Sequence, residues 1–228
     1  MIEKKIVSAL LPVKAFSQRI KNKNIKYLGK YTLLERKILQ LKKSKLIDKI
    51  YVGSDSDFIL KMAEELGAIP IDRDPKACDE SQASANLMIK DFVDKVETDI
   101  AVWVHITNPF IYGEHYDQAI EAFSTNNNDS LVSLTKIQSH MWNKDFFPIN
   151  FNPYAEKHPF ASECDPYFYQ NGAIFIQKLD DFKSNSYFYG NRPYPFILDS
   201  MVAYDINIPN EFEIAEQLQN YMDKLYNF

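Results

Sequence analysis

Short apolar runs alternate along this chain with longer amphipathic stretches, and this alternation constrains the fold more than any other feature of the sequence. Apolar runs bounded by turn residues predict strands at residues 6–11, 50–53, 100–106, 130–135 and 173–177. Helical spacing of apolar residues predicts helices at residues 32–43, 57–66, 84–96 and 114–123. The alternation favours an α/β fold with a mainly parallel sheet, in which ligands bind at the carboxyl ends of the strands.

A last helix is expected from Pro209, because proline is favoured in the first turn of a helix. Apolar residues then recur at helical spacing. We expect them to form one face of the helix: Phe212, Ala215, Leu218, Tyr221, Met222 and Leu225.

Residues 138–170 interrupt the alternation with a segment rich in aromatic residues and proline. A structureless loop of this length is uncommon in a compact domain, and so much exposed aromatic surface would be a liability. We therefore expect a protruding subdomain that packs against a partner subunit or covers a substrate. The length of 228 residues fits one α/β domain over residues 1–228 that carries this insert.

A cluster of basic residues surrounds the end of the first predicted strand. Residues 4–34 contain eight Lys or Arg and no acidic residue, whereas the whole chain has a formal net charge of −5. A positive loop on an acidic protein indicates a local anion site, and its place after a strand favours phosphate. The loop, residues 12–24, lacks the glycines of a Walker A or Rossmann dinucleotide motif. A solvated loop of charges without a ligand is the alternative.

The remaining composition argues against several classes of protein. Cys78 and Cys164 lie far apart without metal-ligand spacing, so two unpaired thiols in a reducing compartment are expected. No apolar run approaches the roughly 20 residues of a membrane span, and no segment resembles a signal peptide. The sequence pI of about 5.4 argues against general nucleic-acid binding. We expect a cytoplasmic protein without nucleic-acid or membrane partners.

Residues 12–25 read P-V-K-A-F-S-Q-R-I-K-N-K-N-I and resemble the motif P-A-R-x-G-S-K-R-I-x-x-K-N-I of acylneuraminate cytidylyltransferases, the CMP-sialic acid synthetase family. Further segments resemble motifs of that family in the same order. They are V-G-S-D at 52–55, A-E-E-L-G-A at 63–68, D-R-D-P at 72–75, residues 79–86, H-I-T-N-P at 105–109, N-G-A-I-F at 171–175 and Y-D-I-N-I-P-N-E-F at 204–212. The resemblance spans most of the chain, and the joint order of its motifs is specific.

This resemblance implies a Rossmann-like three-layer α/β sandwich of the nucleotide-diphospho-sugar transferase type, which dimerises through its inserted subdomain. It also implies a CTP-dependent nucleotidyltransferase. Such an enzyme transfers CMP from CTP to a sugar acid for surface glycan synthesis, releases pyrophosphate and usually requires Mg²⁺. Attack of a sugar hydroxyl on the α-phosphorus needs charge neutralisation and in-line positioning more than a covalent intermediate.

The resemblance assigns roles to ten residues. Those expected at the triphosphate and ribose are Lys14, Ser17, Arg19, Lys23 and Asn24. Those expected around the rest of the site are Arg73 at the cytosine, Ser84 near it, His105 beside the sugar, and Asp205 and Asn207 at Mg²⁺. Of these, Lys14, Lys23 and Asp205 are the expected catalytic groups. A few carboxylates together with phosphate oxygens form a typical Mg²⁺ site.

The chain departs from the family pattern at positions close to the expected phosphates. Lys14, Ala15 and Phe16 stand where the family has an arginine and paired glycines. Lysine keeps the charge but loses bidentate geometry, and a bulky Phe16 restricts the approach of backbone to phosphate. Asn207 replaces a second aspartate. It would hold Mg²⁺ more weakly, or it is simply the N-cap or the turn before the last helix.

Three other candidates have plain structural alternatives. His105 could be a histidine satisfied by hydrogen bonds at a strand end. Arg73 could pair only with Asp72 or Asp74. Asp55, also at a strand end, is expected to be the N-cap of the following helix.

The acceptor is the least defined part of the expected reaction. Relatives often carry an arginine, suited to a sugar carboxylate, about eleven residues before N-G-A, where this chain has Phe160. This difference argues against sialic acid itself as the acceptor and favours a related nonulosonic or ulosonic acid. A different acceptor such as a sugar phosphate, or nucleotide binding without turnover, are the rival hypotheses.

Overall fold

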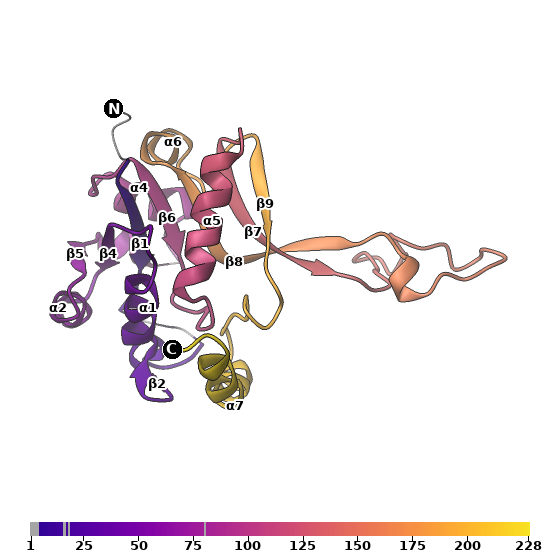
Figure 1. Cartoon of the computed structure of the whole chain (residues 1–228), viewed down its shortest axis with the longest axis horizontal. Helices are drawn as coiled ribbons and strands as arrows, with labels where there is room; N and C mark the ends of the chain where they lie inside the picture. The colour runs from indigo at the N-terminus through magenta and orange to yellow at the C-terminus, as the bar shows by residue number, and fades with distance from the viewer. Residues whose placement is uncertain (1–4, 16, 18, 80) are drawn as a thin grey trace.

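The structure is a computed structural model that describes residues 5–15, 17, 19–79 and 81–228. Its centre is a seven-stranded sheet with the strand order β5-β4-β1-β6-β8-β7-β9 (Figure 1). The strands are β1 (Val7–Pro12), β4 (Lys49–Ser54), β5 (Ile69–Asp72), β6 (Ile100–Val104), β7 (Ser130–Ile137), β8 (Tyr167–Lys178) and β9 (Pro193–Ile197). Only β8 runs antiparallel to its neighbours in this sheet. The prediction of a mainly parallel α/β sheet is confirmed.

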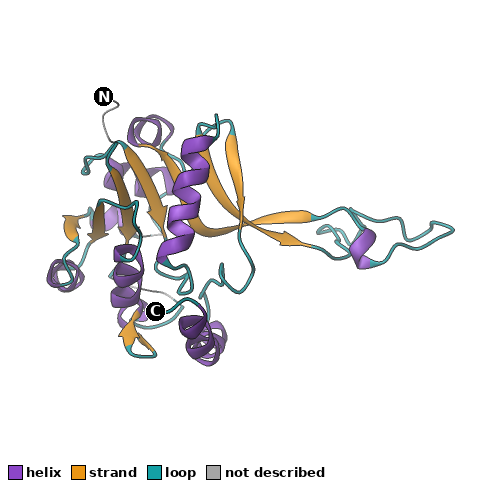
Figure 2. Ribbon diagram, in the orientation of Figure 1, coloured by secondary structure: helices purple, strands orange, loops and turns teal. Residues whose placement is uncertain are grey.

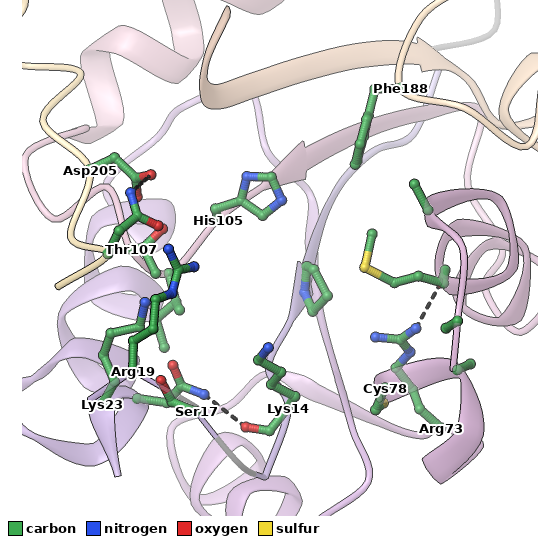
Figure 3. Close-up of a pocket in the computed structure, with 18 of the residues that line it drawn as sticks. Lys14, Ser17, Arg19, Lys23, Arg73, Cys78, His105, Thr107, Phe188 and Asp205 are labelled. Atoms are coloured by element: carbon green, nitrogen blue, oxygen red, sulfur yellow. Dashed lines mark hydrogen bonds between the residues drawn. The ribbon is translucent and has the colours of Figure 1, made fainter. Parts of the chain in front are cut away.

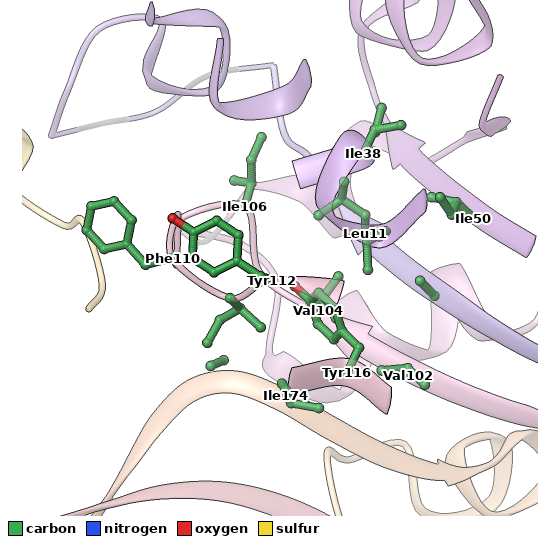
Figure 4. Packing of buried hydrophobic residues seen from close by; sticks show 14 of the residues in the cluster. Leu11, Ile38, Ile50, Val102, Val104, Ile106, Phe110, Tyr112, Tyr116 and Ile174 are labelled. Carbon is green, nitrogen blue, oxygen red and sulfur yellow. The ribbon is translucent and has the colours of Figure 1, made fainter. Parts of the chain in front are cut away.

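Successive residues of a strand point to opposite faces of the sheet, and helices cover both of these faces. Ala9 and Leu11 pack with α1 (Leu33–Lys42), α2 (Asp57–Glu65), α5 (Gly113–Thr125) and α7 (Pro209–Leu225), whereas Leu10 packs with α4 (Ala85–Val93) and α6 (Leu179–Asn185). Figure 2 shows the resulting layers, and Figure 4 shows the first of the two cores between α1, β1, β6 and α5. The short elements are β2 (Tyr27–Leu28), β3 (Tyr31–Thr32), α3 (Pro75–Cys78) and the 3₁₀ turns Lys23–Ile25 and Ala161–Glu163.

The apolar face predicted for the last helix is only partly buried. Phe212, Ala215 and Met222 lie in the core, whereas Tyr221 is 60% exposed and Leu225 is 54% exposed. The predicted helix from Pro209 is confirmed, but the fold buries only part of its apolar residues and leaves the outer ones uncovered. They are directed away from the sheet and toward solvent.

The segment 138–166 sits at the end of a long arm that projects from the sheet (Figure 1). The outer halves of β7 and β8 form the stem, in which Ile137 pairs with Tyr167. Aromatic side chains are well exposed on the arm: Trp142, Phe146, Phe147, Tyr154 and Phe160. The role predicted for this insert, in a dimer or as a cover over a substrate, stays a prediction.

Both cysteines, Cys78 and Cys164, are free thiols, as expected. Across the described part of the chain, no helix combines the length and the apolar character that a membrane crossing requires.

Candidate active site

A cavity of about 450 Å³ opens at the carboxyl ends of β1, β5 and β6. All ten candidate residues line it, although they come from five separate stretches of the chain (Figure 3). They are Lys14, Ser17, Arg19, Lys23, Asn24, Arg73, Ser84, His105, Asp205 and Asn207. Their functional roles stay predictions, but the fold brings them together around one space.

The basic loop after β1 is held in place by hydrogen bonds. The Val13 N–H donates to the Gly53 carbonyl (2.8 Å), and the Asn24 amide donates to the Lys14 carbonyl (2.8 Å). Lys23 and Asn24 are each only 7% exposed, so the alternative of a solvated loop is wrong for these two residues. Of the three departures from the motif, Phe16 lies outside the described residues, and Ala15 is half-buried.

Asp55 holds the same loop from the neighbouring strand. Its Oδ1 accepts a hydrogen bond from the Ala15 N–H at 2.7 Å. The expectation that Asp55 caps the following helix is wrong, because Ser56 occupies the N-cap of α2 and its hydroxyl faces the Ile59 N–H. A carboxylate at the end of β4 thus fixes the backbone of the cationic loop.

His105 follows β6 and has both ring nitrogens engaged. Nδ1 lies 2.5 Å from the Gly172 carbonyl, and Nε2 lies 3.2 Å from the Trp103 indole nitrogen. The indole and the carbonyl can be satisfied together only if Nδ1 carries the proton and Nε2 accepts. Burial lowers the pKa of His105, although the bond to Gly172 opposes this. The ring is therefore neutral and forms part of the cavity wall. This agrees with the alternative that His105 is a histidine satisfied by hydrogen bonds at a strand end.

The last cavity wall is the loop before α7. The Lys23 ammonium donates to the Ile206 carbonyl (2.8 Å), and the Ile206 N–H donates to the Thr107 carbonyl (2.9 Å). These bonds place Asp205 beside the basic loop (Figure 3). The Asn207 amide donates to Asp205 Oδ2 at 2.6 Å.

Asp205 fits a metal ligand better than Asn207 does. Asp205 Oδ1 is buried and has no hydrogen-bond partner among the described residues, which is an unfavourable state for a carboxylate oxygen unless a cation or donor joins it. Asn207 turns its nitrogen, not its oxygen, toward Asp205. The described residues contain no cluster of three His, Cys, Asp or Glu side chains that could hold a metal alone. A divalent cation here would need further oxygens, such as those of a triphosphate.

Asn207 is also not the N-cap of the last helix. Ile208 takes that position, and Glu211 Oε2 accepts from the N–H groups of Asn207 (2.5 Å) and Ile208 (3.0 Å). The alternative of an N-cap is therefore wrong, whereas its place in the turn before the helix is confirmed.

Arg73 forms the opposite wall and is 3% exposed. Its Nε donates to Asp91 Oδ2 (3.0 Å) and its Nη2 donates to the Met88 carbonyl (2.7 Å). The alternative that Arg73 pairs only with Asp72 or Asp74 is therefore wrong. Ser84 lies nearby as the N-cap of α4, where its hydroxyl accepts from the Leu87 N–H at 3.2 Å. A serine directly before a helical pattern is a signal of this cap.

The sequence interpretation missed Phe188 and Met88, which also line the cavity. Phe188 stacks on Phe175 with ring centroids 4.6 Å apart and lies beside His105. The only available signal was the aromatic run 187–189 after α6, and a core role would account for that run equally well.

Comparisons with known proteins show what the chain as a whole is similar to. The family model described as cytidylyltransferase matches residues 9–227. An N-acylneuraminate cytidylyltransferase of Streptococcus agalactiae serotype V is 24% identical over 212 residues, which cover 89% of this chain and 51% of the relative. The post-translational flagellin modification protein B of Campylobacter coli is 25% identical over 223 residues, which cover 89% of this chain and 90% of that protein.

Among solved structures, a CMP:2-keto-3-deoxy-manno-octonic acid synthetase complexed with CTP superposes with a TM-score of 0.70 at 13% identity, over 95% of this chain and 99% of that one. At this identity the likeness is one of fold. The chain spans about half the length of the N-acylneuraminate cytidylyltransferases that it matches. The resemblance drawn from the sequence motifs is confirmed.

Proposed function

Because the chain belongs to the cytidylyltransferase family, we propose that it transfers CMP from CTP to a sugar acid and releases pyrophosphate. The observation that carries this proposal is the meeting of three cationic side chains, Lys14, Arg19 and Lys23, with the carboxylate of Asp205 at one cavity. Cations that face a carboxylate with an unpartnered oxygen suit a triphosphate bound together with a divalent metal.

The proposed reaction is a displacement at the α-phosphorus of CTP. The acceptor hydroxyl oxygen bonds to that phosphorus, the bond to the bridging oxygen of the β-phosphate breaks, and the hydroxyl proton passes to water. Lys14 and Lys23 neutralise the charge that develops on the leaving pyrophosphate. His105 would shape the acceptor site only as a neutral wall residue, because both of its ring nitrogens already have partners.

Asp205 is the proposed protein ligand of Mg²⁺, through its unpartnered Oδ1. Mg²⁺ would supply charge neutralisation on the phosphate oxygens when bound. Asn207 orients Asp205 through the bond to Oδ2, and this role agrees with its geometry better than direct ligation does.

The acceptor is proposed to be a sialic acid-like nonulosonic or ulosonic acid that is activated for surface glycan synthesis. The sequence relatives support a sugar acid, since one of them is named an N-acylneuraminate cytidylyltransferase. Phe160, which stands where an arginine is common in the family, is 73% exposed on the arm. The acceptor carboxylate would therefore need a cation from elsewhere, which favours an acid other than sialic acid itself.

The exposed aromatic side chains of the arm support a homodimer in which this segment packs against a second copy. Sedimentation of the intact chain tests this part separately. If the chain stays monomeric across the micromolar range, the alternative that the arm covers the substrate is favoured.

The decisive experiment measures pyrophosphate release from CTP and Mg²⁺ with a panel of sugar acids and sugar phosphates. Release with CTP and at least one sugar acid is expected. Release only with a sugar phosphate would identify a different acceptor class, and release with UTP or ATP but not CTP would contradict the cytidylyl assignment. CTP binding without release for every acceptor would indicate a nucleotide-binding protein.

A further inference from the structure

Arg73 is fixed in the cavity wall by contacts along its whole side chain. Its aliphatic stem crosses the end of β4 at Gly53, where a Cβ would lie 2.6 Å from Arg73 Cδ. Its guanidinium lies 5.4 Å from the centroid of the Phe92 ring. Glycine at position 53 is therefore the residue that leaves room for the arginine to reach the cavity.

Two of the three guanidinium nitrogens are occupied by α4. Nε donates to Asp91 Oδ2 and Nη2 donates to the Met88 carbonyl, both from the same helix. Nη1 has no hydrogen-bond partner among the described residues. In Figure 3, which draws only the Nη2 bond to Met88, the guanidinium of Arg73 lies across the cavity from Lys14. The planar fork of arginine means that fixing two nitrogens also fixes the direction of the third.

The surroundings of Asp91 stabilise the negative charge of its carboxylate. Its side chain is 9% exposed, and its second oxygen accepts from the Lys95 ammonium at 2.7 Å. Burial would raise the pKa of Asp91, but the bonds and charges of Lys95 and Arg73 keep it below its usual value. A carboxylate that is ionised and held from both sides makes a rigid support for the guanidinium.

We propose that Asp91 is a positioning residue for nucleotide selection, which aims Arg73 Nη1 at the acceptor edge of the bound pyrimidine. The inference rests on the proposed function, because it needs CTP in this cavity. Cytosine presents two adjacent acceptors, O2 and N3, whereas uracil carries a proton on N3. Both bases accept at O2, so only a donor locked toward N3 favours cytosine, and a donor that swings freely loses that preference.

The test compares Asp91→Asn with Asp94→Asn, a matched control at the C-cap of the same helix. Asp94 pairs with Lys90 but is 43% exposed. The affinity for CTP and UTP is measured by calorimetry, and KM and kcat are measured by pyrophosphate release. For Asp91→Asn we expect CTP affinity to fall about tenfold, UTP affinity to change less, and kcat at saturating CTP to stay within about threefold, as for a weakened charge-assisted hydrogen bond. Asp94→Asn should match the wild-type chain in all of these.

Two further variants make every outcome informative. If Arg73→Ala loses CTP affinity while Asp91→Asn keeps it, the positioning role is wrong but the nucleotide site stands. If Arg73→Ala also binds CTP like the wild-type chain, the placement of the nucleotide itself is wrong. Should Asp91→Asn fail to fold, Asp91→Glu replaces it. That variant keeps the charge and shifts it by one methylene, so weaker CTP binding supports the proposal and unchanged binding overturns it.

Discussion

Asp55 Oδ1 accepts a hydrogen bond from the Ala15 N–H at 2.7 Å and so ties the end of β4 to the cationic loop that follows β1. The two residues are 40 positions apart, and their strands are parallel neighbours in the sheet. The bond fixes the loop backbone beside Lys14, where the triphosphate is proposed to bind. An acidic residue so close to a phosphate site is unfavourable for binding unless it serves such a structural purpose.

Asp55→Ala should therefore reduce turnover, although it removes a negative charge from the site. We expect kcat/KM for CTP to fall about tenfold, because the Ala15 N–H loses its acceptor and the loop loosens. Asp55→Asn should lose less, since its amide oxygen can still accept. Asp57→Ala, an exposed neighbour in the first turn of α2, is the control. Equal kcat/KM for Asp55→Ala and the control would contradict the assigned role.

Lys23→Ala should abolish pyrophosphate release and also cost stability. The sequence alone suggested an exposed loop at this position, but the ammonium is buried and donates to the Ile206 carbonyl. Removal leaves that carbonyl without its partner, which costs about 1–2 kcal/mol of unfolding free energy in urea titrations. Lys21→Ala, an exposed lysine of the same loop, should change neither quantity. Activity near the wild-type level in Lys23→Ala would refute the placement of the phosphates.

The variant His105→Gln tests whether His105 only lines the cavity or accepts a proton during the reaction. Both ring nitrogens have partners, so the imidazole has no free lone pair for the acceptor hydroxyl. Glutamine can accept and donate at similar positions, and we expect kcat to stay within about tenfold of the wild-type value with an unchanged pH profile. A loss of more than about a hundredfold, together with the loss of one limb of the pH profile, would identify His105 as a general base.

The central strands were predictable because they are continuous apolar runs, as β1 and β6 illustrate. The two edge strands were missed. β5 contains Pro70 and β9 contains Pro193 and Pro195, and proline argues against a strand in the sequence although it is tolerated at sheet edges.

In the site, residues that belong to local motifs were predictable from the sequence, whereas their tertiary contacts were not. The motifs indicated which residues matter, since each motif is a local pattern. The partners came only from the fold: Asp91 for Arg73, and Gly172 for His105. These contacts join elements whose approach depends on sheet order, so spacing along the chain carries no signal of them.

His115 should make the stability of the protein pH-dependent. Burial lowers its pKa to about 4, and its Nδ1 accepts from the Tyr112 N–H at 3.0 Å. Above pH 6.5 both the folded and the unfolded state are neutral at this position. As the pH falls, the unfolded state takes up the proton first, so stability is lost between pH 6.5 and 4.

The expected loss from this group between pH 7 and pH 5 is about 2 kcal/mol of unfolding free energy. Urea titrations at the two pH values measure it. His115→Gln should show a smaller difference between them, whereas His158→Gln, on the exposed arm, should behave like the wild-type chain. An unchanged pH dependence in His115→Gln would mean that the ring is not held neutral in the folded state.

Asp223→Ala should destabilise the fold more than any change to an exposed ion pair. Arg36 on α1 is 1% exposed and is bonded to both carboxylate oxygens of Asp223 on α7, to the Tyr112 hydroxyl and to the Pro109 carbonyl. Truncation of Asp223 leaves a buried guanidinium without its counter-charge, at a cost of about 3 kcal/mol.

Asp94→Ala breaks only the exposed pair with Lys90 and should cost less than about 1 kcal/mol. Urea titrations at pH 7.5 compare the two variants. Because α7 follows the loop that carries Asp205, a loosened Arg36–Asp223 pair should also weaken CTP binding in the presence of Mg²⁺. If Asp223→Ala lost stability but bound CTP like the wild-type chain, the loop before α7 would be held by its own bonds to Lys23 and Thr107 rather than by the helix.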